Sequence, residues 1–152
     1  MEQLVDAMIG TLDQQVVLYE DLYSLSQKKH ELLVGRDLQA LDKVVSAEEL
    51  LLLKAGRLEE RRMSLQREIA TRLGMDEDTT TLDQMAKALD TDRQAALSSV
   101  KQQLFEVFEK LALQNQMNME LIVNSLRYID FSIRTMTGGQ TDSAQAIFDK
   151  KA

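Results

Sequence analysis

The sequence predicts an all-α protein, an elongated antiparallel helical bundle or coiled coil of three long helices with a short helical insert and a mobile C-terminal tail. Its 152 residues include no proline and only 6 glycines, so few positions favour turns. Apolar residues recur every three or four positions over three long stretches, which is the period of one helix face. We therefore expect a single helical domain over residues 1–139 and a flexible tail over residues 140–152.

The first expected helix spans residues 2–34. Its apolar face consists of Leu4, Met8, Leu12, Val16, Tyr19 and Tyr23. Gly35 follows, and glycine readily takes the left-handed conformation that ends a helix. Asp37 is then the expected N-cap of the next helix, because its carboxylate can accept a free backbone N–H group.

The second expected helix spans residues 38–73 and ends before Gly74. Its apolar residues follow a heptad-like seam, formed by Leu41, Val44, Leu51, Ala55, Leu58, Leu65 and Ile69. A seam of this length with a mixed-charge surface predicts that the second helix pairs with the first as a helical hairpin.

The stretch MDEDTTTLDQMAKALD, residues 75–90, interrupts the long helices. Thr81 followed by Gln84 matches a capping box, in which each side chain satisfies a free backbone N–H group of the other residue. This motif predicts a short helix over residues 82–89.

The last expected helix spans residues 92–137 and ends at two glycines, Gly138 and Gly139. Thr91 and Gln94 repeat the capping signal at its start. Its predicted core stripe consists of Leu97, Val100, Leu104, Phe108, Leu111, Ile122, Leu126, Ile129 and Ile133.

The second half of this last helix is apolar on two faces, as residues 118–133, NMELIVNSLRYIDFSI, illustrate. In the first half, the face opposite the core stripe carries polar residues such as Gln102 and Glu106. In the second half, the corresponding face carries Leu113, Met117, Leu121, Tyr128 and Phe131. A helix that is apolar nearly all round must bury both faces.

Helix length indicates where the second face lies. At about 1.5 Å per residue, the last helix is about 65–70 Å long and the first about 50 Å, so the final turns extend past their cover. An extra apolar face on a poorly covered helix end is typical of an interaction site. Three interpretations remain open: a groove for a helix of a partner protein, a self-association surface of a homodimer, and burial with the last helix between the other two.

The composition excludes several kinds of chemistry. Without cysteine there are no disulfides, zinc-thiolate sites or thiol nucleophiles. His30 is the only histidine, and near a helix end a surface or capping role is expected for it. The acidic loop from Asp76 is not a calcium loop, because its sixth position is Thr81 and its twelfth is Lys87. We expect no enzyme activity, no catalytic residues, no cofactor and no metal.

Charge and hydropathy narrow the partners and the compartment. The formal net charge of -7 argues against nucleic acid. The start, MEQLVDAMIG, lacks the basic and continuously apolar regions of a signal peptide. No apolar run reaches the roughly 18 residues of a membrane span. We therefore expect a cytoplasmic protein without membrane insertion.

Two stretches of the chain resemble the FlgN family of flagellar export chaperones. The first is residues 35–75, with a glycine-acid-leucine start, a leucine seam with charged spacers and a Leu-Gly stop. The second is residues 118–133. The residues that carry the second match are Asn118, Leu121, Ile122, Ser125, Leu126, Tyr128 and Ile129. With length and helix order included, the resemblance spans nearly the whole chain.

The resemblance implies a chaperone of the hook-filament junction proteins, the hook-associated subunits. Such a chaperone covers the client's sticky helical terminus, prevents premature assembly and delivers the client to the export gate. Because the family binds through its C-terminal helix, the expected client-binding residues are Leu113, Met117, Leu121, Ile122, Leu126, Tyr128, Ile129 and Phe131.

In the tail, Ile147 and Phe148 are expected to dock on the cytoplasmic domain of the export gate, although the glycine that follows this aromatic in the family is missing here. Two alternative functions stay open. One is a homo-oligomeric coiled-coil scaffold, and the other is an adaptor or chaperone of another secretion system.

Overall fold

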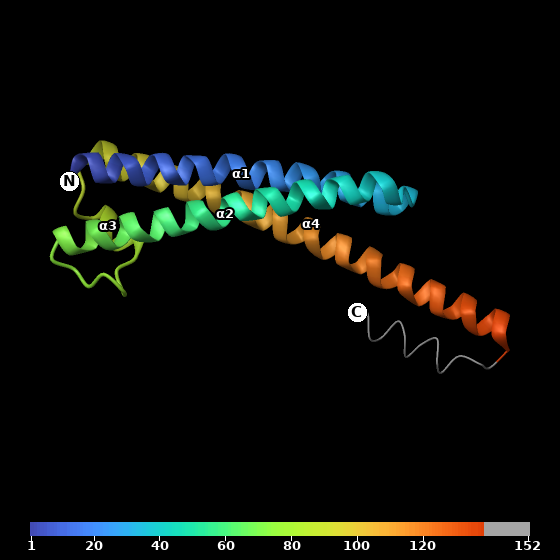
Figure 1. Cartoon of the computed structure of the whole chain (residues 1–152). Helices are drawn as coiled ribbons and strands as arrows, with labels where there is room; N and C mark the ends of the chain where they lie inside the picture. The colour runs from blue at the N-terminus through green and yellow to red at the C-terminus, as the bar shows by residue number, and fades with distance from the viewer. Residues whose placement is uncertain (139–152) are drawn as a thin grey trace.

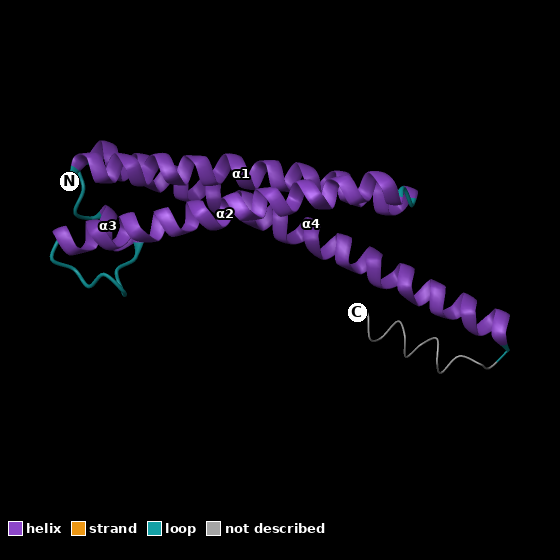
Figure 2. Cartoon of the chain, in the orientation of Figure 1, coloured by secondary structure: helices purple, strands orange, loops and turns teal. Residues whose placement is uncertain are grey.

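A computed structural model of the chain describes residues 1–138 and contains four helices there, and no strand. They are α1 (Glu2–Gly35), α2 (Leu38–Arg72), α3 (Leu82–Ala86) and α4 (Thr91–Thr137). Helices α1 and α2 form an antiparallel hairpin, α3 lies at the open end of that hairpin, and α4 runs in the same direction as α1 (Figures 1 and 2). The predicted all-α bundle of three long helices with a short insert is confirmed. The predicted tail lies outside the described residues.

Helix α1 is the central element of the bundle. Both α2 and α4 pack along it, whereas no Cα atom of α2 lies within 8 Å of one in α4 over residues 1–138. The interpretation in which the last helix sits between the other two is therefore wrong. Each of the two outer helices is held mainly by its contact with α1.

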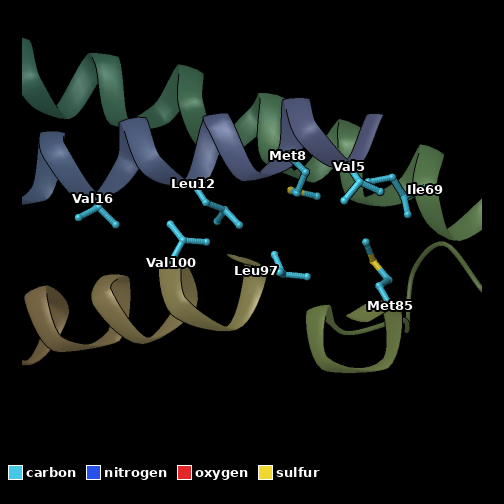
Figure 3. Packing of buried hydrophobic residues seen from close by; sticks show 8 residues of the cluster. All are labelled: Val5, Met8, Leu12, Val16, Ile69, Met85, Leu97 and Val100. Atoms are coloured by element: carbon cyan, nitrogen blue, oxygen red, sulfur yellow. The ribbon is translucent and has the colours of Figure 1, made fainter. Parts of the chain in front are cut away.

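The main core lies where all four helices meet. Its buried residues are Val5, Met8, Leu12, Val16, Ile69, Met85, Leu97 and Val100 (Figure 3). A smaller cluster of Leu18, Leu22 and Ala55 follows along the hairpin, with Leu111 of α4 packed against it. Burying a large apolar side chain contributes about 1.5–3 kcal/mol, so these clusters hold the outer helices on α1. The apolar faces predicted for α1 and α2 are buried or half-buried at every predicted position.

Several predicted helix ends are confirmed. The Asp37 carboxylate accepts the backbone N–H of Ala40 at 3.1 Å and caps α2. Thr81 and Gln84 form the complete capping box at the start of α3. Gly74 and Gly138 take left-handed backbone conformations, with φ of 71° and 61°, just past α2 and α4. Glycine adopts this conformation without a steric penalty, so these two ends follow from the sequence.

The end of α1 differs from the prediction. Gly35 is still helical, and Arg36 is the residue with a positive φ, 55°. The N–H groups of Arg36 and Asp37 close the helix on the carbonyls of Leu33 and Leu32. Asp37 provides the last N–H group of this closing motif and also caps α2. The left-handed conformation therefore falls on Arg36, the residue directly before Asp37.

The connection from α3 to α4 also differs. Helix α3 ends at Ala86 rather than at residue 89, because the N–H groups of Ala88 and Leu89 bond three residues back and turn the chain. Asp90, not Thr91, caps α4, since its carboxylate accepts the N–H of Arg93 at 2.9 Å. Aspartate is at least as good an N-cap as threonine, so α4 begins one residue earlier than predicted.

Arg93 joins the first turns of α1 and α4. Its Nε atom lies 2.9 Å from Oδ1 of Asp6, and its Nη1 atom lies 2.9 Å from Oδ2 of Asp90. The side-chain hydrogen bond from Arg93 lowers the pKa of Asp6 below its usual value. The backbone N–H of Arg93, followed by its guanidinium, lowers the pKa of Asp90. Both carboxylates therefore favour the folded state when they are charged.

Replacing Arg93 should make stability less sensitive to acid. Because the folded-state pKa values of Asp6 and Asp90 are depressed, their contribution is present above the usual pKa of 3.8 and is lost as pH falls through the lower values. Arg93→Gln should therefore be modestly less stable than the parent at neutral pH, with the difference shrinking in acid. Urea unfolding at neutral and at acidic pH measures the difference in free energy of unfolding between Arg93→Gln and the parent, with Arg67→Gln as the control. A difference that persists unchanged in acid would contradict the assignment.

Candidate functional site

The C-terminal part of α4 projects beyond the hairpin. Helices α1 and α4 begin side by side, but α4 has 47 residues and α1 has 34. Figure 1 shows the orange and red end of α4 leading away from α1 and α2. The predicted overhang of the last helix is confirmed.

The second apolar face of α4 is largely exposed. We call Leu113, Met117, Leu121, Tyr128 and Phe131 the distal stripe. Leu121 is half-buried, whereas the other four are exposed, up to 66% for Phe131. Leu113 and Met117 precede Asn118, which packs on α1, whereas Tyr128 and Phe131 lie toward the projecting end. Exposed apolar side chains along one helix face are typical of an interaction surface.

Ile122, Leu126 and Ile129 were predicted both to bind the client and to belong to the core stripe of α4. Their predicted place in the core is confirmed only in part. Ile122 is half-buried, but Leu126 and Ile129 are exposed. Helix α1 ends at Gly35 and α4 leads away from it, so no described helix covers these positions. All eight predicted residues thus lie on the distal part of α4, and six of them are exposed.

The core stripe of α4 needs two further corrections. Phe108 is exposed, although its ring packs edge-on against Tyr19 with 4.7 Å between centroids. Val107 and Asn118, which the prediction omitted, are buried instead. The side of α4 that faces α1 is therefore rotated slightly from the predicted stripe.

Asn118 is the centre of a buried polar cluster between α1 and α4. Its side chain is only 2% exposed, and its Nδ2 donates to the Ser26 carbonyl at 2.8 Å and to the Ser26 hydroxyl at 3.1 Å. Its Oδ1 accepts from Gln114 and lies 3.0 Å from Nδ1 of His30. The Ser26 hydroxyl donates to Asn115 at 2.8 Å. A polar group that is satisfied only in one alignment fixes the register of α4 on α1.

The sequence reasoning missed this cluster. His30 was expected at the surface or as a cap, but its ring is half-buried and bonds across to α4. A usable signal did exist: Val100, Val107, Leu111 and Asn118 are spaced by seven, four and seven residues. An asparagine in such a seam is a known device for specifying register.

The tip of the hairpin contacts the distal stripe. The guanidinium carbon of Arg36 lies 5.8 Å from the centroid of the Tyr128 ring. This distance is within the range of a cation–π interaction. Tyr128 nevertheless stays 59% exposed, so both groups remain accessible.

Other candidate chemistry is limited over the described residues. Asp76 uses its carboxylate to accept the N–H groups of Asp78 and Thr79 within its own loop. Residues 1–138 hold no group of three His, Cys, Asp or Glu side chains placed to bind a metal. In the same part of the chain, no helix is long and apolar enough to span a membrane. Ile147 and Phe148 lie outside the described residues.

Comparison with known proteins identifies the family. Residues 1–147 match the family described as FlgN protein. No curated protein and no solved structure matches the chain. The family match includes all four helices and the distal stripe, and it extends well beyond the two stretches that carry the resemblance in sequence. The chain therefore belongs to the FlgN family of flagellar export chaperones.

Proposed function

We propose that this protein is a cytoplasmic chaperone that binds hook-filament junction proteins through the distal part of α4. FlgN family chaperones bind hook-associated proteins of the flagellum. The observation that supports this site is the largely exposed distal stripe, which runs along α4 toward its projecting end. Binding there would keep a client from assembling early and would carry it to the export gate.

The binding mode that we propose is helix on helix. An amphipathic client helix lays its apolar face along the distal stripe and against Ile122, Leu126 and Ile129. Tyr128 and Phe131 provide large, stiff anchors, whereas Met117 adapts its shape to different client side chains. Such binding buries the sticky face of the client and uses no nucleotide or metal.

Delivery to the export gate is a separate part of the proposal. Ile147 and Phe148 would dock on the cytoplasmic domain of the gate, since a phenylalanine and an isoleucine in a polar tail suit a short docking element. Retained flagellar export by Phe148→Ala, together with wild-type affinity for the gate, would rule this role out.

Client binding is tested first with the unmodified protein. It is co-expressed with each of the two hook-associated subunits, and its mass alone and in the mixture is measured by size-exclusion chromatography with light scattering. A monomer that forms a discrete complex with either subunit supports the proposal. A stable dimer that binds neither subunit would instead indicate a coiled-coil scaffold.

The site is then tested by truncating two of its side chains. The double variant Leu121→Ala and Tyr128→Ala should bind clients at least about tenfold more weakly, since a central anchor is worth roughly 1–3 kcal/mol. The matched control is Leu50→Ala with Leu53→Ala, which removes exposed leucines from α2. Circular dichroism verifies that both variants stay helical. Wild-type affinity of the first variant would contradict the site.

A further inference from the structure

We infer that the tip of the α1–α2 hairpin is a second, cationic wall of the client site, where Arg36 pairs with an acidic side chain of the client helix. This inference rests on the proposed function and names the chemistry of the partner. The tip consists of residues 34–38 and joins α1 to α2. The client helix would then touch two separate parts of the protein.

The backbone of Arg36 is the first observation. Its φ of 55° lies in the left-handed region, which disfavours residues with a Cβ atom. Glycine usually occupies this place in a helix-closing motif. A long cationic side chain at such a position is unfavourable for the turn alone, so it points to a role outside the turn.

The direction of the side chain is the second observation. From the tip, the guanidinium of Arg36 reaches across to α4 and lies 5.8 Å from the centroid of the Tyr128 ring. Tyr128 belongs to the distal stripe, so the charge is held at the edge of the apolar surface. A helix bound on the stripe would therefore pass within reach of Arg36.

The missing counter-charge is the third observation. Some cations of residues 1–138 have carboxylate partners, such as Lys29 with Glu48 at 3.3 Å and Arg62 with Glu59 at 2.6 Å, whereas Arg36 is among those that form no ion pair. No described carboxylate lies within ion-pair distance of Arg36. An unpaired cation beside an apolar stripe is complementary to a helix that carries an acidic residue next to its apolar face.

The neighbours of Arg36 extend the apolar surface. Val34 and Leu38 flank it and are 62% and 75% exposed. They belong to α1 and α2, so both helices of the hairpin present apolar area at the tip. Apolar side chains around a charged group exclude water from its ion pair and so strengthen the ion pair.

The experiment measures binding of the two purified hook-associated subunits to the full chain over a range of salt concentrations. Arg36→Glu should weaken the affinity about tenfold, mainly through slower association, because reversed rim charges act on encounter. Arg36→Gln should weaken it about threefold and reduce its salt dependence, since one screened attraction is lost. The matched control Arg57→Glu, an exposed arginine of α2, should change the affinity less than about twofold.

A further variant separates binding from folding. Arg36→Gly removes the charge and suits the left-handed backbone. Its midpoint of urea unfolding should therefore equal or exceed that of the parent, whereas its affinity for clients should be lower. Arg36→Glu binding as well as Arg57→Glu does, with unchanged salt dependence, would overturn the inference and leave the proposed function standing. Failure of the unmodified protein to bind either subunit would overturn both.

Discussion

Leu12→Ala should lower the free energy of unfolding by about 2–5 kcal/mol, the range for removing a buried leucine side chain. Leu12 is 0% exposed and belongs to the main core, which also includes residues of α2, α3 and α4. Because α1 holds both outer helices, a cavity in its buried face at Leu12 weakens both interfaces at once. The loss should therefore lie in the upper part of this range.

Urea unfolding followed by far-ultraviolet circular dichroism measures this loss. The control is Val17→Ala on the same helix, where the side chain is exposed, and it should change stability by less than about 0.5 kcal/mol. A loss below about 1 kcal/mol for Leu12→Ala would mean that the site collapses easily and that α1 is not the central support.

Asn118→Asp should destabilise the protein by about 3–5 kcal/mol at neutral pH, the range for leaving an uncompensated charge buried. This change replaces the Nδ2 donor, 2.8 Å from the Ser26 carbonyl, with a second oxygen. Two oxygens that face each other there repel, and water cannot reach a site that is 2% exposed. Nδ1 of His30 lies 3.0 Å from the other oxygen.

The destabilisation caused by Asn118→Asp should increase with pH. Burial and the facing carbonyl raise the folded-state pKa of the introduced carboxyl above its unfolded value of about 3.9. The charge-dependent part of the destabilisation is therefore absent below that value, grows as pH rises toward the folded-state pKa, and is complete above it. The control is Asn124→Asp, an exposed site of α4 with the same chemical change. Equal stability of the two variants at neutral pH would refute the role of the buried cluster.

Periodicity and capping chemistry predict much of this fold. Local sequence is enough to identify the helix ends at Asp37, Gly74 and the Thr81–Gln84 pair. Each of these residues ends or caps a helix through backbone groups that are only a few residues away in the sequence. The apolar faces of α1 and α2 follow for the same reason, since a period of three to four residues defines one side of a helix. The distal stripe was found because it departs from that single-sided pattern.

The remaining features depend on contacts between helices, which periodicity does not encode. It shows which residues share a face, but not that α1 is the middle helix or that its end leaves Leu126 and Ile129 exposed. The left-handed conformation falls on Arg36 because two helices share one connection, which a rule for a single helix end misses. Asn118 is buried because its partners come from Ser26 and His30 on another helix.

The uneven support of α4 has a thermodynamic consequence for chaperone action. Before Asn118, opening α4 requires separation from the main core, whereas the projecting end is held by its own helical hydrogen bonds, by local side-chain contacts such as Arg134 with Asp130, and by the contact of Tyr128 with Arg36. Segments of this kind open locally at a much smaller free-energy cost than global unfolding. Part of the free energy of client binding would then be spent on ordering that end. With clients bound at this end as proposed, their release requires only that one helix terminus frays while the core stays folded.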